Sequence, residues 1–374
     1  MKQIVISGTG VFTPEESITN QELVKAYNSY AESYNLVNKD DITQGNKVEL
    51  ELSDAEFIFN ASGIKNRFVM DKKGILDPNI MHPILKRRSN DEPSILAEMS
   101  LKAAQKAMER AGKKANDIDA VITACSNLER AYPAISIEVQ ALLGIKGFAF
   151  DMNVACSSAT FALQAAADMI RSGSAKTILI VDPEICSGHL DFKDRDCHFI
   201  FGDVCTAMIL ESKQTAQSKN SFEILSTKCV TKFSNNIRNN FGFLNNAKKS
   251  SPLDRDLLFM QEGRKVFKEV VPLVSQLIID HVDDEKIKID DIRRLWLHQA
   301  NKSMNDLIGK KVLGRVPETH EQPNILQDYA NTSSAGSIIA FSLYSEDMKN
   351  GEIGVLCSFG AGYSVGSVIL RKIS

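Results

Sequence analysis

One pattern occurs twice along this chain and limits the folds that it can adopt. Each copy carries Asp-Ile and an apolar strand that ends in Asn, then a Ser-Ser-Ala segment before an apolar helix, then a passage from a glycine into the next strand. The matching pairs of stretches are 117–127 with 291–301, 156–159 with 332–335, and 173–183 with 351–359. Three matches in register predict an internal duplication.

Each copy alternates strands with helices, and its strands are continuous apolar runs, as in sheets that are covered on both faces. The predicted fold class is therefore α/β. The polar stretch 212–221 is typical of a linker. We expect an N-terminal half over residues 1–215 and a C-terminal half over residues 216–374, with insertions in the first half at about 28–51 and 71–92.

Local signals define several elements of the first half. The stretch 4–12 predicts a strand, and Thr19 is suited to cap a helix that begins near Gln21. Residues 56–68 predict a helix, with Gly63 as its C-cap. Residues 94–111 predict an amphipathic helix that ends before a glycine.

The composition excludes several classes of protein. With 43% hydrophobic and 24% charged residues among 374, the chain is an ordinary globular one. A net charge of −3 argues against a nucleic-acid partner. There is no long apolar run and no signal peptide, so we expect no membrane association. Seven scattered cysteines without a C-x-x-C pair favour reduced thiols, a cytoplasmic location and no metal site.

Cys156 is the first candidate catalytic residue. It follows the short strand 148–152 and a break, and it opens a helix that is apolar nearly all round. Unpaired N–H groups and the positive end of the dipole at a helix start favour thiolate, which predicts a thiol pKa lowered toward ~7. A packed core cysteine is equally compatible with this stretch taken alone.

His298 and Asn331 are the second and third candidates. His298 ends a predicted strand, where α/β sheets present ligand-binding groups, and Asn331 precedes the segment that corresponds to Cys156. Alone, the first could be a structural histidine and the second an Asx turn. Two equivalent halves packed together would bring all three side chains to one cleft.

The sequence resembles the ketoacyl synthases of the thiolase superfamily, specifically the β-ketoacyl-ACP synthase III group. The motifs that carry the resemblance are Val-Ala-Cys-Ser-Ser at 154–158, His-Gln-Ala-Asn at 298–301, Asn-Thr-Ser-Ser-Ala-Gly-Ser at 331–337, and Phe-Gly-Ala-Gly-Tyr at 359–363. They stand in family order at family spacing. The resemblance implies a thiolase-like duplicated αβαβα layered fold.

The resemblance also implies a reaction. Cys156 would accept an acyl group from a thioester, and the backbone N–H groups of Cys156 and Ala361 would form the oxyanion hole. The family usually has Gly where Ala361 stands. His298 and Asn331 would donate hydrogen bonds to the malonyl thioester during decarboxylation. Neither step needs a metal or a redox cofactor, so no cofactor is expected beyond the CoA and ACP thioesters.

Further positions are assigned to substrates and partners by the same resemblance. Phe57 replaces the tryptophan that stacks on the CoA adenine, and Arg195 matches the other stacking residue; Ala61 replaces an arginine. Tyr132 matches a residue that crosses a homodimer interface and floors the partner's acyl pocket. Phe267 and Gly360 complete the expected substrate contacts. Lys268, Lys310 and Lys311 match basic positions that the family uses for the acidic acyl carrier protein. Lys302 is also expected to bind it, beside Ser303, which replaces an arginine of the family.

The two insertions resemble those of the longer branch of β-ketodecanoyl-ACP synthases, which take medium-chain acyl-CoA. We therefore expect an acyl-CoA primer such as octanoyl-CoA, with acetyl-CoA as the other candidate, to condense with malonyl-ACP in fatty acid biosynthesis. The alternatives are a related thiolase-fold acyltransferase, an enzyme that condenses two acyl chains head to head, and a Cys-His-Asn thiol hydrolase.

Overall fold

The computed structural model describes residues 2–247, 251 and 253–373. Its strands are β1 (Ile4–Phe12), β2 (Glu16–Thr19), β3 (Asn66–Val69), β4 (Ala120–Ala124), β5 (Phe148–Met152), β6 (Thr177–Ile185), β7 (Asp203–Ser212), β8 (Phe222–Ser234), β9 (Ile237–Arg238), β10 (Met260–Gln261), β11 (Ile292–Leu297), β12 (Ile353–Gly360) and β13 (Gly362–Lys372). Its α-helices are α1 (Asn20–Val37), α2 (Lys39–Thr43), α3 (Ala55–Ser62), α4 (Lys72–Leu76), α5 (Ile95–Ala111), α6 (Ile135–Leu143), α7 (Ser158–Ser172), α8 (Gly263–Asp284), α9 (Lys302–Leu313), α10 (Leu326–Tyr329) and α11 (Ala335–Leu343).

The strand pairing repeats between the two parts of the chain. Nine strands hydrogen-bond in the order β11-β12-β13-β8-β1-β7-β6-β4-β5. β4 and β6 pair in parallel, whereas β6 with β7 and β7 with β1 are antiparallel. β11, β12, β13 and β8 repeat the same three relations in the same order. The predicted α/β class and the duplicated thiolase-like architecture are therefore confirmed.

The two runs of strands meet where β1 pairs with β8, through Val5 opposite Glu223 and Ile6 opposite Phe222. β7 ends at Ser212 and β8 begins at Phe222, so the predicted linker joins the last strand of one run to the first of the other. The division of the chain into halves at residue 215 stays a prediction.

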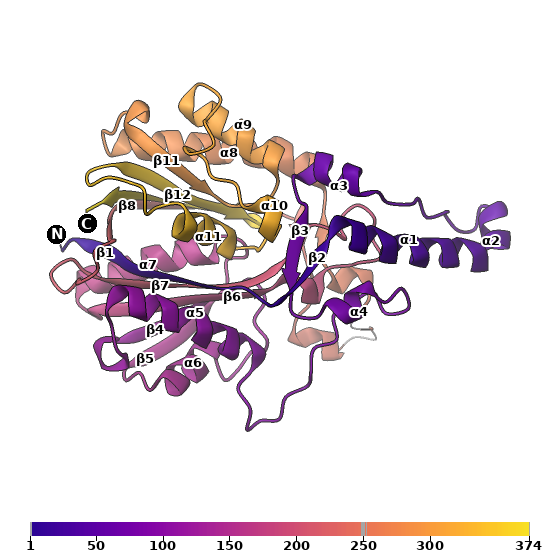
Figure 1. The fold of residues 1–374 in the computed structure, drawn as a ribbon, viewed down its shortest axis with the longest axis horizontal. Coiled ribbons are helices and arrows are strands. Elements are labelled where there is room, and N and C mark those ends of the chain that lie inside the picture. Colours follow the sequence, from indigo (N-terminus) through magenta and orange to yellow (C-terminus); the bar gives the residue numbers. More distant parts are fainter. Residues whose placement is uncertain (1, 248–250, 252, 374) are drawn as a thin grey trace.

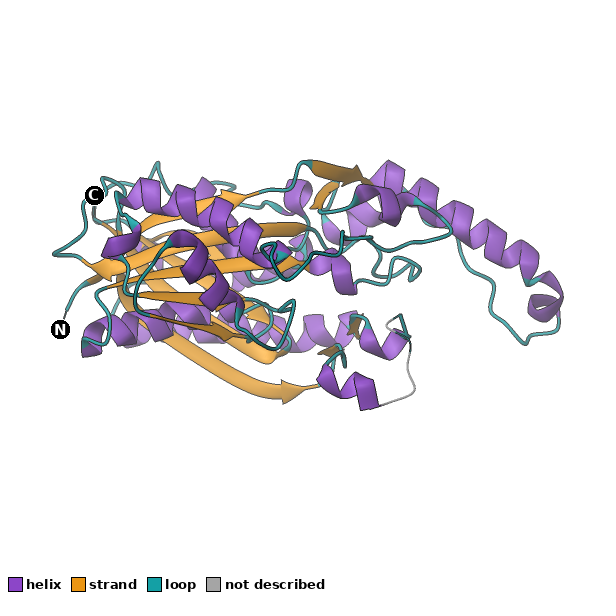
Figure 2. Ribbon diagram, turned by 90° about the horizontal axis from the view of Figure 1, so that it is seen from below, coloured by secondary structure: helices purple, strands orange, loops and turns teal. Residues whose placement is uncertain are grey.

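The layers follow from which helices pack on which strands. α7 and α11 lie between the two runs of strands and contact both (Figures 1 and 2). α5 and α6 cover the outer face of the first run, and α8 and α9 lie outside the second. The largest core cluster lies around the two central helices, which explains why their sequences are apolar nearly all round.

Capping explains several helix ends. Thr19 and Glu22 form a capping box at the start of α1, as predicted. Ser94 caps α5, and the left-handed Gly112 ends it. α3 ends before Gly63, whose φ is +84°. The predicted end of this helix at Gly63 is confirmed. Beyond it, residues 66–69 form β3, whose side chains alternate between buried and half-buried against β2.

The two segments that we interpreted as insertions differ in secondary structure. α1 and α2 reach out from the body of the molecule (Figures 1 and 2), and the returning chain is held by hydrogen bonds between the Asn35 amide and the backbone of Leu50. In the second segment, α4 is followed by chain without a helix or strand until α5 begins at Ile95.

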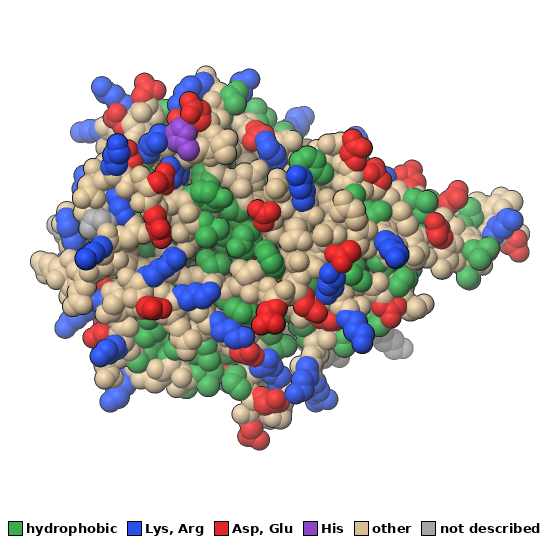
Figure 3. Space-filling view, viewed as in Figure 1, with side chains coloured by type: hydrophobic (Ala, Val, Ile, Leu, Met, Phe, Trp, Pro, Cys, Tyr) green, Lys and Arg blue, Asp and Glu red, His purple; other side chains and the backbone are tan. Residues whose placement is uncertain are grey.

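Within the described residues, no helix has the length and apolar character needed to cross a membrane. All seven cysteines are unpaired thiols. No group of three or more His, Cys, Asp or Glu side chains is placed to hold a metal ion in the part of the chain that the structure describes. Figure 3 shows basic and acidic side chains interspersed over one face of the molecule, in keeping with the small net charge.

Candidate active site

Cys156 stands on a sharp turn between β5 and α7. The turn is formed by residues 153–155, where the Asn153 side chain accepts a hydrogen bond from the Ala155 N–H (2.9 Å) and Ala155 has a φ of +48°. The N–H of Ser158 donates to the Ala155 carbonyl. Since α7 begins at Ser158, Cys156 precedes the helix instead of lying in its first turn.

His298 directly follows β11, as predicted, and its backbone N–H donates to the Cys357 carbonyl at 2.7 Å. The Asn305 side chain donates to the His298 carbonyl at 2.9 Å. The ring is almost completely buried and meets Phe359 edge to face. These contacts fix both the backbone and the imidazole.

Asn331 bridges to Phe201 of the first half: its N–H donates to the Ile200 carbonyl, and its carbonyl accepts from the Gly202 N–H. Its side-chain Oδ1 accepts from the Ser333 N–H at 2.9 Å. With the oxygen engaged in this way, the carboxamide offers its N–H groups to a ligand.

One cavity of about 460 Å³ is lined by Cys156, His298 and Asn331 together. The three residues that we predicted to meet are up to 175 positions apart in the sequence, and the structure places them at one site. Most of the remaining wall is apolar, with the side chains of Phe57, Ile64, Phe199, Ile200, Phe201, Ile237, Phe259, Val266, Phe267, Val270, Met304 and Phe359. The catalytic roles of the three residues stay predictions.

The expectation of a lowered thiol pKa is wrong for the structure. Burial raises the pKa of Cys156 to about 11. The Ser333 hydroxyl, 3.5 Å from the sulfur, opposes this shift, and the charge of Glu184 reinforces it. The pKa of the thiol is not lowered, because desolvation of the sulfur outweighs the hydrogen bonds that it receives.

Burial also lowers the pKa of His298 to about 4, and a hydrogen bond to the Ser333 backbone only partly offsets this. The imidazole is therefore neutral near pH 7. A neutral ring has one N–H and carries no charge, so the donor that now faces the Ser333 backbone is the one that would bind a thioester oxygen.

The backbone at the end of β12 lies against Cys156. A Cβ on Gly360 would stand 2.5 Å from the Cβ of Cys156 and 3.1 Å from its sulfur, so only glycine fits there. The backbone N–H groups of Ala361 and Cys156 both act to lower the pKa of the thiol, so both lie close to the sulfur. Ala361 does not have a positive φ, so its methyl group causes no backbone strain at this predicted oxyanion hole.

The predicted substrate residues fall into two groups. Phe57, Phe267 and Gly360 line the cavity. Arg195 is not part of the lining, but its guanidinium lies 4.6 Å from the centre of the Phe57 ring, so the two predicted adenine contacts stack on each other. Arg195 also donates to the Leu52 carbonyl at 2.8 Å.

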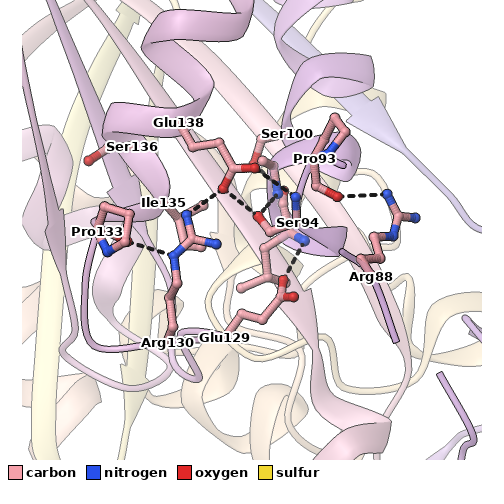
Figure 4. Close-up of polar contacts among 12 residues, drawn as sticks. Arg88, Pro93, Ser94, Ser100, Glu129, Arg130, Pro133, Ile135, Ser136 and Glu138 are labelled. Atoms are coloured by element: carbon pink, nitrogen blue, oxygen red, sulfur yellow. Dashed lines mark hydrogen bonds and ion pairs between the residues drawn. The ribbon is translucent and has the colours of Figure 1, made fainter. Parts of the chain in front are cut away.

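Tyr132 is 85% exposed and lies outside the cavity of its own chain. Its loop is tied down, as Figure 4 shows: Arg130 donates to the Pro133 carbonyl (2.8 Å) and to Glu138 (2.5 Å). Glu138 in turn accepts from the N–H and hydroxyl of Ser94. The exposed aromatic ring is thus carried by a well-anchored loop.

The four predicted carrier-binding lysines are all exposed and lie on two helices that pack together. Lys268 is on α8, whereas Lys302, Lys310 and Lys311 are on α9. Lys302 forms an ion pair with Asp306 at 2.5 Å, so part of its charge is compensated.

Two residues at the site were missed by reasoning from the sequence. Ser333, which contacts the sulfur of Cys156, lies inside the 331–337 motif. Its contact depends on a φ of +52°, which no sequence pattern predicts. Arg264, which is exposed and lines the cavity, is one turn before Lys268 on α8. That spacing places both on one helix face and could have identified it.

Comparison with known proteins identifies the family of this chain. The family model of 3-oxoacyl-[acyl-carrier-protein] synthase III matches residues 150–232, and the model of the C-terminal part of the same family matches residues 282–372. The β-ketodecanoyl-[acyl-carrier-protein] synthase of Pseudomonas aeruginosa is 58% identical over 349 residues, which cover 93% of this chain and 100% of that protein. A β-ketoacyl-[acyl-carrier-protein] synthase III of Clostridium perfringens is 28% identical over 380 residues, covering 99% of this chain and 100% of its own.

Among solved structures, 3-oxoacyl-[acyl-carrier-protein] synthase III of Aquifex aeolicus superposes with a TM-score of 0.77 at 24% identity, over 98% of this chain and 99% of the other. At that identity the superposition supports the fold alone. The sequence comparisons go further, since a 58% identical relative is covered over its whole length. This chain belongs to the 3-oxoacyl-[acyl-carrier-protein] synthase III (β-ketoacyl-ACP synthase III) family.

Proposed function

We propose that this protein is an acyltransferase that condenses an acyl-CoA primer with malonyl-ACP, with loss of CO₂, and releases a 3-oxoacyl-ACP for fatty acid biosynthesis. The observation that supports it best is the single cavity shared by Cys156, His298 and Asn331, with the backbone N–H groups of Cys156 and Ala361 close to the sulfur. The relatives named above are synthases of this kind.

In the first step, the Cys156 sulfur attacks the thioester carbonyl of the acyl-CoA. The new C–S bond forms as the bond to CoA breaks, and the proton of the thiol leaves with CoA as its free thiol. The oxyanion of the tetrahedral intermediate is bound by the N–H groups of Cys156 and Ala361. Because the free thiol has a raised pKa, these donors must supply much of the stabilisation in this step.

In the second step, the malonyl thioester oxygen accepts hydrogen bonds from His298 and Asn331. The bond to the carboxylate breaks, CO₂ leaves, and the resulting enolate carbon attacks the acyl-cysteine. The Cys156 sulfur is expelled as a thiolate and regains its proton from water. A neutral His298 is the better donor for this purpose, because an imidazolium would protonate the enolate that must react. Both steps use only the CoA and ACP thioesters, and we propose no metal or redox cofactor.

For the primer we propose medium-chain acyl-CoA, such as octanoyl-CoA. The most similar curated relative described above is named for a ten-carbon β-keto product, which is the length that octanoyl-CoA and a two-carbon extension give. The apolar and aromatic wall of the cavity suits an alkyl chain. Turnover with acetyl- through decanoyl-CoA at fixed malonyl-ACP should peak near octanoyl-CoA, and a maximum at acetyl-CoA would contradict the proposal.

We propose a homodimer that buries the edge of the sheet next to Tyr132. β5 is the last strand of the nine-stranded sheet, and Phe148 on it is 41% exposed. Ile137 and Leu142 on the neighbouring helix α6 are 48% and 44% exposed. We further propose that the lysines on α8 and α9 receive the acidic acyl carrier protein, and that the enzyme works in the cytoplasm, where its thiols stay reduced.

The first experiment is mass spectrometry of the intact protein after incubation with a mixture of acyl-CoAs, followed by peptide mapping. We expect one acyl adduct, on Cys156, that disappears when malonyl-ACP is added. Cys156→Ala is the matched control and should acquire no adduct. Acylation at another residue, or an adduct that malonyl-ACP does not discharge, would refute the proposed sequence of steps.

A further inference from the structure

Two carboxyl groups are buried side by side on β6, close to the active site. Asp182 and Glu184 have no exposed surface. The hydroxyl oxygen of Ser334 lies 2.6 Å from Asp182 Oδ1 and 2.9 Å from Glu184 Oε1. A hydroxyl carries one hydrogen and can donate it to one of the two, so one carboxyl must bring a hydrogen of its own.

The surroundings decide which carboxyl is charged. Glu184 accepts from the N–H and the hydroxyl of Ser126, at 3.0 and 2.5 Å, and it also receives hydrogen bonds from Ser334. Among the residues that the structure describes, Asp182 has only Ser334 and a long contact of 3.5 Å to Thr206 as hydrogen-bond partners. The anion is therefore Glu184, and Asp182 is the acid that donates to Ser334.

The partners of Glu184 lead to both catalytic turns. On one side, the Ser126 carbonyl accepts from the Asn153 side chain, which forms the turn directly before Cys156. On the other side, Ser334 follows Ser333, which contacts the Cys156 sulfur and whose N–H holds the Asn331 side chain. Glu184 thus joins the turn that carries the nucleophile to the turn that carries Asn331.

We propose that Glu184 is a positioning residue, held as an anion by Ser126 and Ser334 with Asp182 as its protonated neighbour, and that its charge fixes the two turns that present Cys156 and Asn331. This proposal rests on the proposed function for its kinetic consequences. Neither carboxyl lines the cavity, so neither touches the substrate.

The proposal predicts a dependence on pH. Burial raises the pKa of Glu184 to about 7 and holds that of Asp182 well above its ordinary range. The anion is present above this pH and is lost as the pH falls through about 7. The ionisable groups that interact electrostatically with the pair are the thiols of Cys125, Cys156, Cys186 and Cys205.

The kinetic test uses Glu184→Gln with Asp182→Asn as its matched variant. A carboxamide imitates a protonated acid, so Asp182→Asn should lower kcat less than about threefold. Glu184→Gln removes the anion and should lower kcat by up to about 100-fold through misplacement of the two turns, with an unchanged KM for acyl-CoA. Equal losses in the two variants, or an unimpaired Glu184→Gln, would overturn the proposal.

The pH profile is best measured as single-turnover condensation of pre-acylated enzyme with malonyl-ACP, because Cys156 then has no thiol to titrate. The wild-type rate should fall as the pH drops through about 7, and this limb should be absent in Glu184→Gln. Ser126→Ala removes one donor to the anion and should move the limb upward by about one pH unit. A wild-type rate without this limb, or a limb that Ser126→Ala leaves in place, would refute the role of the charge.

A second readout does not depend on condensation. The pH profile of iodoacetamide alkylation at Cys156, followed on its tryptic peptide, reports the thiol pKa directly. Because the Glu184 charge raises that pKa, Glu184→Gln should shift the profile to lower pH by several tenths of a unit, and Asp182→Asn should leave it in place. If the wild type fails to condense but these shifts appear, the proposed function fails and the charge assignment stands; absent shifts in folded variants refute the assignment.

Discussion

Replacing Gly360 by Ala should disable the acylation step while leaving the fold largely intact. The new Cβ would stand 2.5 Å from the Cβ of Cys156 and 3.1 Å from both its backbone N and its sulfur. Carbon atoms do not approach this closely, so either the Cys156 turn or the backbone at 360–361 must move. That backbone carries the N–H of Ala361, which acts to lower the pKa of the Cys156 thiol.

The size of the effect follows from what is displaced. Losing one preorganised oxyanion donor costs about 2.7–4 kcal/mol of transition-state stabilisation, or about 10²–10³ in rate. The steric shift itself is a local overpacking, which typically costs about 1–3 kcal/mol of stability. Activity should therefore fall far more than stability does.

The assay is the rate of octanoyl transfer from octanoyl-CoA to Cys156, followed by rapid quenching and mass spectrometry. Thermal denaturation gives the stability of each variant. Gly242→Ala is the control, because Gly242 has an ordinary φ and nothing within 4 Å of where its Cβ would be. Acylation of Gly360→Ala within threefold of wild type, with the fold intact, would refute the proposed position of the oxyanion hole.

Three other predictions can be tested with the same protein. His298→Ala should still acylate Cys156, since the imidazole acts on the malonyl thioester, but should lose condensation by at least about 100-fold; measured condensation near the wild-type rate would contradict the role. Because burial raises the pKa of Cys156 to about 11, the rate of its alkylation should rise about tenfold per pH unit between pH 7 and 10, and a plateau below pH 9 would show that the thiol is more acidic than the structure implies. Lys310→Glu combined with Lys311→Glu should raise the KM for malonyl-ACP several-fold and more strongly at low salt, while the KM for octanoyl-CoA stays unchanged; parallel changes in both KM values would place the carrier elsewhere.

Much of the site could be predicted because it depends on topology. The repeated order of strands places His298 at the end of a strand, whatever the details of packing. It also places the turn after Asn331 at the position that corresponds to Cys156 in the other copy. The three candidates therefore came together in one cavity as expected. Local sequence signals identified the cap at Thr19 and the end of α5 at Gly112, because capping depends on residues that are neighbours in the sequence.

What could not be predicted depends on atoms that meet across the fold. The pKa of Cys156 is determined by how much protein surrounds the sulfur, and a helical pattern contains no measure of that. The contact of Ser333 with the sulfur, and the shared hydroxyl between Asp182 and Glu184, each need coordinates from both halves. The strand at 66–69 was missed for a related reason. It pairs with β2, which lies about fifty residues earlier in the sequence, with Glu16 opposite Val69.

The repeated strand order has an implication for the history of this enzyme. One copy of the repeat supplies the proposed nucleophile, and the other supplies the imidazole and the carboxamide that we propose to act on malonyl-ACP, so in this mechanism neither copy alone could carry out both steps. A progenitor with a single copy would have needed two subunits to build such a site, and both subunits would have had to change together. Fusion into one polypeptide would have released each half to specialise, one in covalent capture and the other in decarboxylation.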